Sequence, residues 1–216
     1  MNAGRHFHLS RRCLAPVILL ALTDCASLLG LGGGPPPHLY RLTSVAAFPP
    51  DLPHVPAQLL VEALQAPGGL DTRRVALSRS VLSLDYFADS EWVDTLPELI
   101  RTTLVDSFEN SHAIVALGRD AIGLRADFAL RSEIRHFEAE YGAAGGAPRV
   151  SAVIVVELVK MPAGEIVAER TFAATEPAAA NTIPAVVTAF DAALARILQQ
   201  IVVWTLTNPA LSPARS

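Results

Sequence analysis

The sequence predicts an α+β fold: a mainly antiparallel β-sheet with two main helices packed on it, as a single domain that follows a signal peptide and a Gly/Pro tether. Apolar residues recur at helical spacing in two segments, residues 96–109 and about 182–206. The other ordered segments are short and rich in β-branched residues, as strands are. Several of them follow one another between the two helices, and this order favours antiparallel pairing.

The first residues have the zones of an export signal. A region with three arginines is followed by an apolar run from Cys13 to Thr23, which is much shorter than the ~20 residues that a membrane-spanning helix needs. The pair Arg11-Arg12 is followed by a poor version of a twin-arginine motif, so general secretion is favoured. We interpret residues 1–24 as a lipoprotein signal peptide.

Cys25 lies directly behind this run. Leu22-Thr23-Asp24-Cys25 resembles a bacterial lipobox, whose cysteine receives diacylglycerol, although Asp24 stands where a small uncharged residue is usual. The alternative is that Cys25 is an incidental thiol near an ordinary cleavage site. Its position between the apolar run and a Gly/Pro segment favours lipidation, and the acyl chains would anchor the domain to a membrane without spanning it.

The domain boundaries follow from composition. Residues 25–38 contain GLGGGPPPH and are expected to form a flexible tether. Their glycines do not form a phosphate-binding loop, because no strand precedes them and no helix follows. The folded domain is expected at 39–206, and residues 207–216 are expected to form a disordered tail.

Five short strands are expected around the first helix. They begin with LYRLTSV (39–45) and AQLLVEAL (57–64), continue with β-prone pieces at 74–76 and 83–87, and resume behind the helix with HAIVALG (112–118). The helix has a capping-box signature, with Thr95 as N-cap, Glu98 three residues later and Pro97 in the first turn. Its apolar face should pack on the sheet.

The second half of the domain is expected to form three long elements and a final helix. Residues 126–141 alternate as a strand, and a shift of parity at Phe137 indicates a β-bulge. Residues 149–160 and 165–174 flank MPAG and predict a β-hairpin. Asn181 or Thr182 is expected to cap a helix that continues to about Leu206 and ends near Pro209.

The composition excludes several classes of protein. Apolar residues make up 51% of the chain and charged residues 18%, which argues against disorder of the whole chain. The formal net charge of −4 argues against a nucleic-acid partner, because affinity for phosphates depends largely on Lys and Arg. No cysteine follows Cys25, so the domain has neither a disulfide framework nor a cysteine-based metal site.

No motif indicates catalysis, a cofactor or a metal. The HExxH, GxSxG, Walker and EF-hand patterns are absent, so the chain is predicted to be a non-enzyme. A periplasmic hydrolase would require His112 or His136 to converge with a serine and carboxylates, and a metal site would require the scattered histidines to meet in space. An acidic cluster fits no known Ca²⁺ loop, and solvation is its simpler interpretation; it consists of Asp85, Asp89, Glu91 and Asp94.

Three aromatic residues gather ahead of the first helix. Tyr86, Phe87 and Trp92 are candidates for a partner interface, because aromatic side chains are enriched there. The alternative is that they pack the core of their own domain.

From about Tyr40 to Trp204 the chain resembles the ABC-type transport auxiliary lipoprotein family, which includes the lipoprotein of the paraquat-inducible system. The resemblance lies in the order and spacing of several stretches behind Cys25: LYRL, GLDTRRVALSRS, LDYFADSEWVDTLPELIRTTLVDSFENS, ADFALRSEIRHFEAE and VELV...GEIVAERTF. It implies an α/β fold and a periplasmic lipoprotein that works with an ABC permease, an ATPase and a mammalian-cell-entry (MCE) protein to move phospholipids or other lipophiles. Ala26, in place of Asp after Cys25, favours the outer membrane by the usual sorting pattern.

The resemblance leaves one alternative function beside the hydrolase. Because a fold does not fix a function, the chain could instead be an envelope-assembly lipoprotein of another pathway. The sequence also leaves open whether the chain forms a homo-oligomer.

Overall fold

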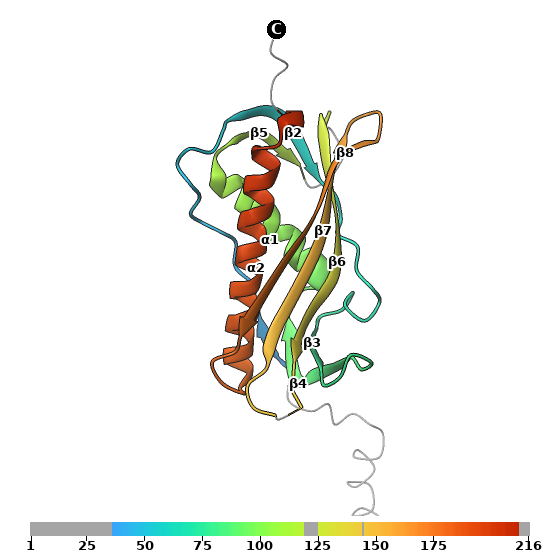
Figure 1. Ribbon diagram of the computed structural model, residues 1–216, viewed down its shortest axis with the longest axis vertical. Helices are drawn as coiled ribbons and strands as arrows, with labels where there is room; N and C mark the ends of the chain where they lie inside the picture. Colours follow the sequence, from blue (N-terminus) through green and yellow to red (C-terminus); the bar gives the residue numbers. More distant parts are fainter. Residues whose placement is uncertain (1–35, 119–124, 144, 212–216) are drawn as a thin grey trace, which may run out of the picture. The chain divides into compact units, whose positions relative to one another are not determined.

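A computed structural model describes residues 36–118, 125–143 and 145–211 (Figure 1). The strands are β1 (His38–Tyr40), β2 (Val55–Val61), β3 (Arg74–Ser78), β4 (Asp85–Trp92), β5 (Ile114–Gly118), β6 (Phe128–Glu140), β7 (Arg149–Lys160) and β8 (Glu165–Pro177). The helices are α1 (Leu96–Ser111), α2 (Ile183–Leu206) and a short 3₁₀ turn, η1 (Pro209–Leu211). The signal peptide, Cys25 and most of the expected tether lie outside the described residues.

The long strand β6 organises the sheet. Along one side it pairs with β7 over its whole length, and β7 pairs in turn with β8. Along the other side its first residues pair with β2, and its last two residues pair with β3. On this side of β6 the sheet therefore has two branches. One branch consists of β2 and then β5, and the other consists of β3, β4 and then β1.

The expected α+β class is confirmed, but the sheet is mixed rather than mainly antiparallel. The β7 hairpins with β6 and β8 and the β3–β4 hairpin are antiparallel, whereas β1–β4, β2–β5, β2–β6 and β3–β6 are parallel. The prediction assumed that strands adjacent in sequence pair with each other. Instead β2 and β3 both pair with β6, more than 50 residues later, and nothing in their sequences shows this.

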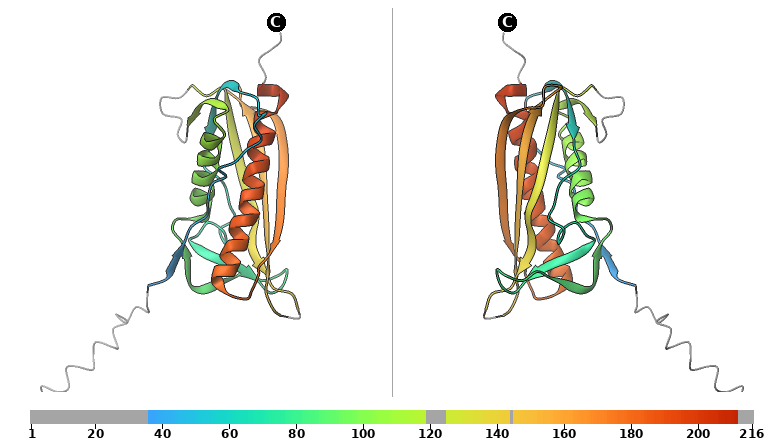
Figure 2. Two further views of the ribbon diagram at one scale, coloured as in Figure 1. Left: turned by 90° about the vertical axis from the view of Figure 1, so that its left-hand side faces the viewer. Right: turned by 90° about the vertical axis from the view of Figure 1, so that its right-hand side faces the viewer.

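Both helices lie on the same side of the curved sheet, and the core fills the space between them and the strands (Figures 1 and 2). Helix α2 packs along β7 and β8. At the centre, the Trp92 ring meets the Phe190 ring edge-on at 5.5 Å, and Phe190 stacks on Phe137 at 4.9 Å. These three rings join β4, β6 and α2, so one aromatic cluster connects both parts of the sheet to the second helix.

The first expected strand is mostly wrong. Only residues 38–40 pair, with β4, and the chain then runs as an irregular strap over the two helices. Thr43 donates from its backbone N–H and its hydroxyl to the Asp191 carboxylate of α2, at 2.7 and 2.9 Å. The Val45 N–H donates to Ser107 Oγ of α1 at 3.0 Å. Helix side chains thus satisfy the backbone groups that a strand would have used.

The expected helices are confirmed, with a different start to the first. Thr95 is its N-cap, but the capping box does not form. The Thr95 N–H, which Glu98 would have received, donates to Asp94 Oδ1 at 2.7 Å. Glu98 instead lies 3.7 Å from the guanidinium of Arg101. Helix α2 begins after Thr182 and ends at Leu206, as the sequence predicts.

The other long elements also follow the prediction. The register of β6 against β7 shifts between Ile134 and His136, which is the expected bulge. The hairpin of β7 and β8 forms around the expected turn, although β8 continues to Pro177. Residues behind α2 are ordered through Leu211, which is buried in the core, so the domain extends beyond the expected boundary at residue 206.

Candidate docking site

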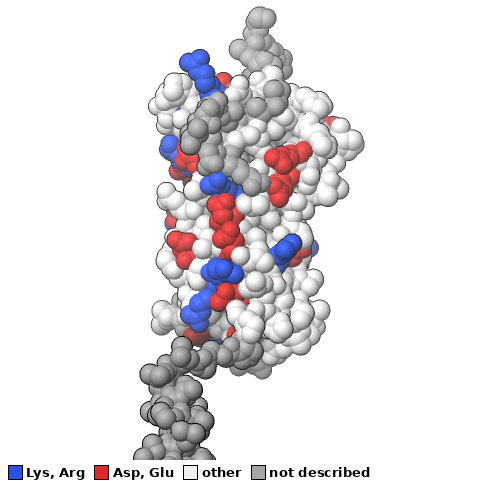
Figure 3. Space-filling model, turned by 180° about the vertical axis from the view of Figure 1, so that it is seen from behind, with Lys and Arg blue, Asp and Glu red and all other residues white. Residues whose placement is uncertain are grey.

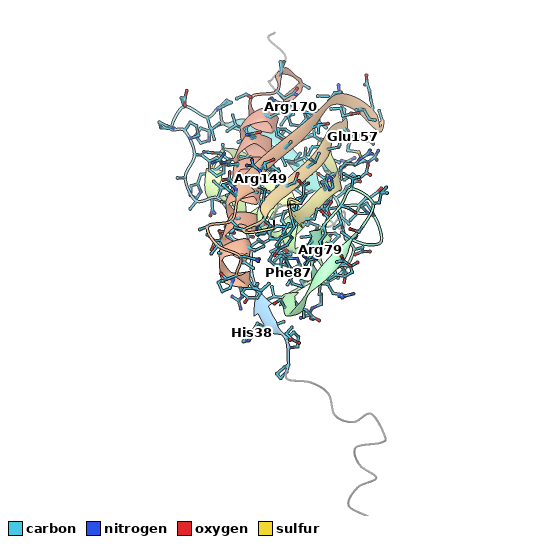
Figure 4. The ribbon with its side chains drawn as sticks, turned by 60° about the horizontal axis from the view of Figure 1, so that its bottom comes forward. His38, Arg79, Phe87, Arg149, Glu157 and Arg170 are labelled. Atoms are coloured by element: carbon cyan, nitrogen blue, oxygen red, sulfur yellow. The ribbon has the colours of Figure 1, made fainter. Side chains whose placement is uncertain are left out.

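An aromatic pocket lies at the end of the domain where the chain enters β1, the lower end in Figure 1. It is a cavity of about 430 Å³. We call it the aromatic pocket; its lining residues are Leu77, Arg79, Tyr86, Phe87, Ala88, Tyr141, Gly145, Gly146, Asn181, Thr182 and Ile183. Figure 4, which brings this end forward, shows Arg79 and Phe87 on it.

Strand β3 brings the parts of the pocket together. It pairs antiparallel with β4, where Ala76 lies opposite Tyr86. It also pairs parallel with the end of β6, and the Tyr141 N–H donates to Ser78 O at 2.9 Å just beyond that pairing. Tyr141 therefore reaches the aromatic residues of β4 although 54 residues separate it from Phe87.

Aromatic rings and arginines alternate around the pocket. The Phe87 and Tyr141 rings are 6.4 Å apart, and the Arg79 guanidinium lies 5.0 Å from the Tyr141 ring centre. Arg74 lies over the Tyr86 ring at 3.8 Å. Such contacts between guanidinium groups and ring faces hold the side chains in place at an exposed surface.

The tyrosine hydroxyls are held as well. Tyr141 donates to Asn181 Oδ1 at 2.8 Å, and Tyr86 donates to Gly69 O at 3.0 Å. Both tyrosines and Phe87 are half-buried. The pocket thus presents ring surface on a fixed frame, and fixed rings lose little conformational entropy when a partner covers them.

The three predicted interface residues have different environments. Tyr86 and Phe87 line the pocket, and their contact with a partner remains a prediction. Trp92 is only 1% exposed and lies in the central ring cluster. A surface role is therefore wrong for Trp92, and the alternative interpretation, packing of its own core, is the correct one.

Arg79 and Asn181 were not predicted as pocket residues. Arg79 lies in the stretch GLDTRRVALSRS and Asn181 was a candidate cap of the second helix, but each reaches the pocket only through pairing or packing between segments far apart in the chain. Tyr141 carried one signal, because it ends the alternating pattern of β6.

The acidic cluster of β4 does not form a metal site in the described part of the chain. Glu91 pairs with Arg73 at 3.6 Å, and Asp94 accepts the N–H of Thr95. Neither Asp85 nor Asp89 belongs to a set of converging metal ligands. These carboxylates are therefore best interpreted as a solvated and partly paired surface.

His136 does converge with carboxylates. It pairs through Nδ1 with Glu138, and a ligand atom of Glu140 lies within 4.8 Å of both. The three residues share one face of β6 and line a cavity of about 280 Å³ with Ser78, Ser80 and Ser83. His112 is not part of this group; it ends α1 in a left-handed conformation.

The serines of this cavity are not hydrogen-bonded to His136 among the described residues. Ser80 Oγ donates to Ser83 Oγ at 3.2 Å, while Ser78 is largely buried. No hydrogen bond joins a serine hydroxyl to His136 in this part of the chain. The arrangement therefore has an imidazole and an acid, but lacks the hydrogen bond that would activate a nucleophile.

Charge is not segregated on the surface seen in Figure 3. Basic and acidic side chains alternate there and do not gather into one basic patch. Two ion pairs on the sheet illustrate the pattern: Arg131 with Glu62 at 3.1 Å and Arg135 with Glu133 at 2.8 Å. Phosphate binding requires an excess of positive charge on one face, which this view does not show.

Helix α2 is the one helix in the described part of the chain that is long and apolar enough to cross a membrane. The mean hydropathy of its most apolar 18-residue segment is 1.5, and half of that segment is buried in the domain. The helix packs there on β7 and β8. A core helix has the same length and composition, so this is weak evidence for a membrane span.

Comparisons with known proteins give one consistent result. The family profile of the ABC-type transport auxiliary lipoprotein component matches residues 40–202. An uncharacterized protein of Bradyrhizobium diazoefficiens is 33% identical over 177 residues, which are 81% of this chain and 47% of that protein. The chain thus spans about half the length of this curated relative.

Two crystal structures share the fold. A Xanthomonas campestris protein of family DUF330 is 27% identical, with a TM-score of 0.74 over 78% of this chain and 94% of that one. An uncharacterized protein is 18% identical, with a TM-score of 0.59 over 77% of this chain and 97% of that one.

Proposed function

The chain belongs to the ABC-type transport auxiliary lipoprotein family, and on that premise we propose that it is a non-enzymatic subunit of an ABC transport system in the cell envelope. The observation that carries the proposal is the extent of the family match. It covers residues 40–202, from the end of β1 almost to the end of α2, so the whole folded domain has the family's pattern.

The anchor is the second part of the proposal. Cys25 carries the lipid and holds the domain on the periplasmic face of a membrane, with the outer membrane favoured. Twelve residues lie between Cys25 and His38, so the extended connection reaches at most ~45 Å. Tethering raises the concentration of the domain near other envelope proteins, so a modest affinity for its partner suffices.

The partner is an MCE-domain protein of the same transport system, together with its permease and ATPase, and the cargo is a phospholipid or another lipophile. The aromatic pocket supplies the docking surface. Its half-buried aromatic rings and Arg79, which lies against the Tyr141 ring, are of the residue types that dominate protein interfaces. Phe87 is the residue of this surface that we expect to contact the partner most directly.

A hydrolase is the weaker candidate. One observation favours it, because His136 pairs with Glu138 in a cavity that also contains serines. The hydroxyls of Ser80 and Ser83 in that cavity hydrogen-bond within their own turn: Ser80 Oγ donates to Ser83 Oγ, and Ser83 Oγ donates to Ser80 O. If the pair were catalytic, the purified protein would hydrolyse a generic ester and His136→Ala would abolish that activity; we expect no such activity in either protein.

Affinity purification from crosslinked envelopes tests the proposed function. The full chain should recover the MCE protein, the permease or the ATPase, and an adjacent position of their genes would agree with this result. Recovery of none of these components would contradict the proposal. Specific recovery of envelope-assembly factors would instead favour the alternative pathway.

A further inference from the structure

We propose that the loop of residues 79–84, which joins β3 to β4, inserts its apolar tip into the membrane surface to which the chain is anchored. The inference rests on the proposed function, because it requires the lipid at Cys25. It adds a second, direct contact between the folded domain and lipid.

The loop concentrates exposed apolar side chains. Val81 is fully exposed and Leu82 is 95% exposed, and Leu84 is 40% exposed. Five large apolar side chains are exposed in the described part of the chain, and these three lie within four residues. Single exposed apolar residues are ordinary, whereas a cluster of them marks a surface that another phase or molecule covers.

Hydrogen bonds hold the tip away from the domain. The Ser83 N–H donates to Ser80 O at 3.1 Å, and Ser80 Oγ donates to Ser83 Oγ at 3.2 Å. The Leu82 N–H lies 3.4 Å from Ser80 Oγ, which accepts from it. The turn is thus closed by its own polar groups, and Val81 and Leu82 project from it into solvent.

The base of the loop is fixed by packing. The Leu84 side chain covers Gly69 so closely that a Cβ atom at that position would lie 2.5 Å from Leu84 Cδ2. On the other side, Arg79 lies over the Tyr141 ring. The exposed tip therefore stands on an ordered base, and it does not depend on a flexible segment for its position.

The position of the loop identifies the membrane as its partner. The β3–β4 connection lies at the same lower end of the domain as β1, where the chain arrives from Cys25 (Figure 1). Figure 4 shows His38 and Arg79 together at this end. Leu39, another exposed apolar residue, lies beside the point of entry at 54% exposure. A lipid at Cys25 would therefore keep this end of the domain within ~45 Å of the bilayer.

The chemistry of the loop also fits a lipid surface. Its apolar tip is flanked by serines and by Arg79, so it has groups for the acyl region and for the headgroup region. Side chains that project singly can enter a bilayer without a complementary pocket.

Site-specific fluorescence tests the proposal in the full, lipidated chain. Leu82→Cys is labelled with an environment-sensitive dye after reconstitution into vesicles of phosphatidylethanolamine and phosphatidylglycerol. The mature chain has no other free thiol if Cys25 carries lipid. Ile166→Cys is the matched control, because Ile166 is an apolar residue at 51% exposure on β8, at the other end of the domain (Figure 1).

We expect the label at position 82 to shift its emission to shorter wavelength and to be quenched by lipids with brominated acyl chains, and the label at position 166 to do neither. Equal, water-like emission at both positions in lipidated protein would overturn the membrane contact and leave the proposed function intact. Palmitate incorporation, measured in the same sample, separates the two cases: protein without lipid would overturn both the anchor and the inference built on it.

Discussion

Trp92 contributes to the stability of the domain, because its side chain is buried in the core and not exposed as a surface residue would be. Its ring is buried between Phe137 and Phe190 and ties β4 to β6 and α2. We expect Trp92→Ala to lower the free energy of unfolding by about 3–5 kcal/mol, because truncation removes buried apolar surface and leaves a cavity. Urea unfolding measures this. Ile166→Ala, at a position exposed on β8, should change stability by less than about 0.5 kcal/mol.

Phe87, unlike Trp92, is partly exposed at the surface of the domain. It is half-buried at the edge of the aromatic pocket and contacts Tyr141. We expect Phe87→Ala to weaken the binding of the transport partner about tenfold or more, since aromatic residues dominate interface energy. A binding titration with the partner recovered from the envelope measures the change.

The matching control for Phe87→Ala is Trp92→Phe. That change perturbs the core but leaves the pocket surface in place, so its partner affinity should stay close to that of the natural chain. If both variants lost affinity together, the effect of Phe87 would be one of folding and not of docking.

The distinction between these two aromatic residues could not be made from the sequence. Both lie in the stretch LDYFADSEW, and both are equally plausible as core or interface residues by composition. Trp92 is a core residue because it packs against Phe137 and Phe190, which are 45 and 98 residues beyond it in the sequence. Similarly, Arg79 and Asn181 join the pocket only because β3, β6 and the start of α2 meet there.

At the scale of elements, local signals were sufficient for the two long helices and for the β7–β8 hairpin. The spacing of apolar residues and the cap position placed α1 and α2 to within two residues at either end. The parity shift also located the bulge of β6. These features depend on neighbours within a few residues, so a single sequence contains them.

Pairing between segments far apart in the chain could not be predicted from the sequence. The strap behind β1 alternates like a strand, yet its partners are side chains of α1 and α2. The parallel pairings of β2 and β3 with β6 likewise depend on contacts across the chain. An alternating pattern indicates that one face is buried, but it does not identify what satisfies the backbone.

The strap gives a prediction at this scale. Asp191 accepts hydrogen bonds from the backbone N–H and the hydroxyl of Thr43, so Asp191→Ala should destabilise the domain by about 1–3 kcal/mol. Hydrogen exchange should accelerate at Thr43 in particular. Thr188→Ala, an exposed change one turn earlier on α2 that leaves the strap contacts intact, should have a much smaller effect.

At the scale of the whole molecule, the end of the domain that the chain enters at His38, the lower end in Figure 1, carries both the aromatic pocket and the apolar loop. The pocket suits a protein partner and the loop suits lipid. A domain held with this end toward a membrane could contact both at the same time. The proposed anchor at Cys25 would favour this orientation, because the chain enters the domain at this end, at His38.

The anchor itself gives the next prediction. Labelled palmitate should be incorporated into the natural chain and not into Cys25→Ser, because Cys25 is the one cysteine behind the apolar run. Asp24→Ala should incorporate at least as much label, since it restores a small residue before the cleaved bond. Equal incorporation into the natural chain and Cys25→Ser would show that the lipid is carried elsewhere.

Photocrosslinking in intact cells tests whether the tether end of the domain docks on a transport component. A photoreactive amino acid replaces Phe87 in one strain and Ile166 in another. We expect a crosslink to the MCE, permease or ATPase component from position 87 and none from position 166. Crosslinks to that component from position 166 alone, or from neither position when it is present in the envelope, would show that this end of the domain is not the docking surface.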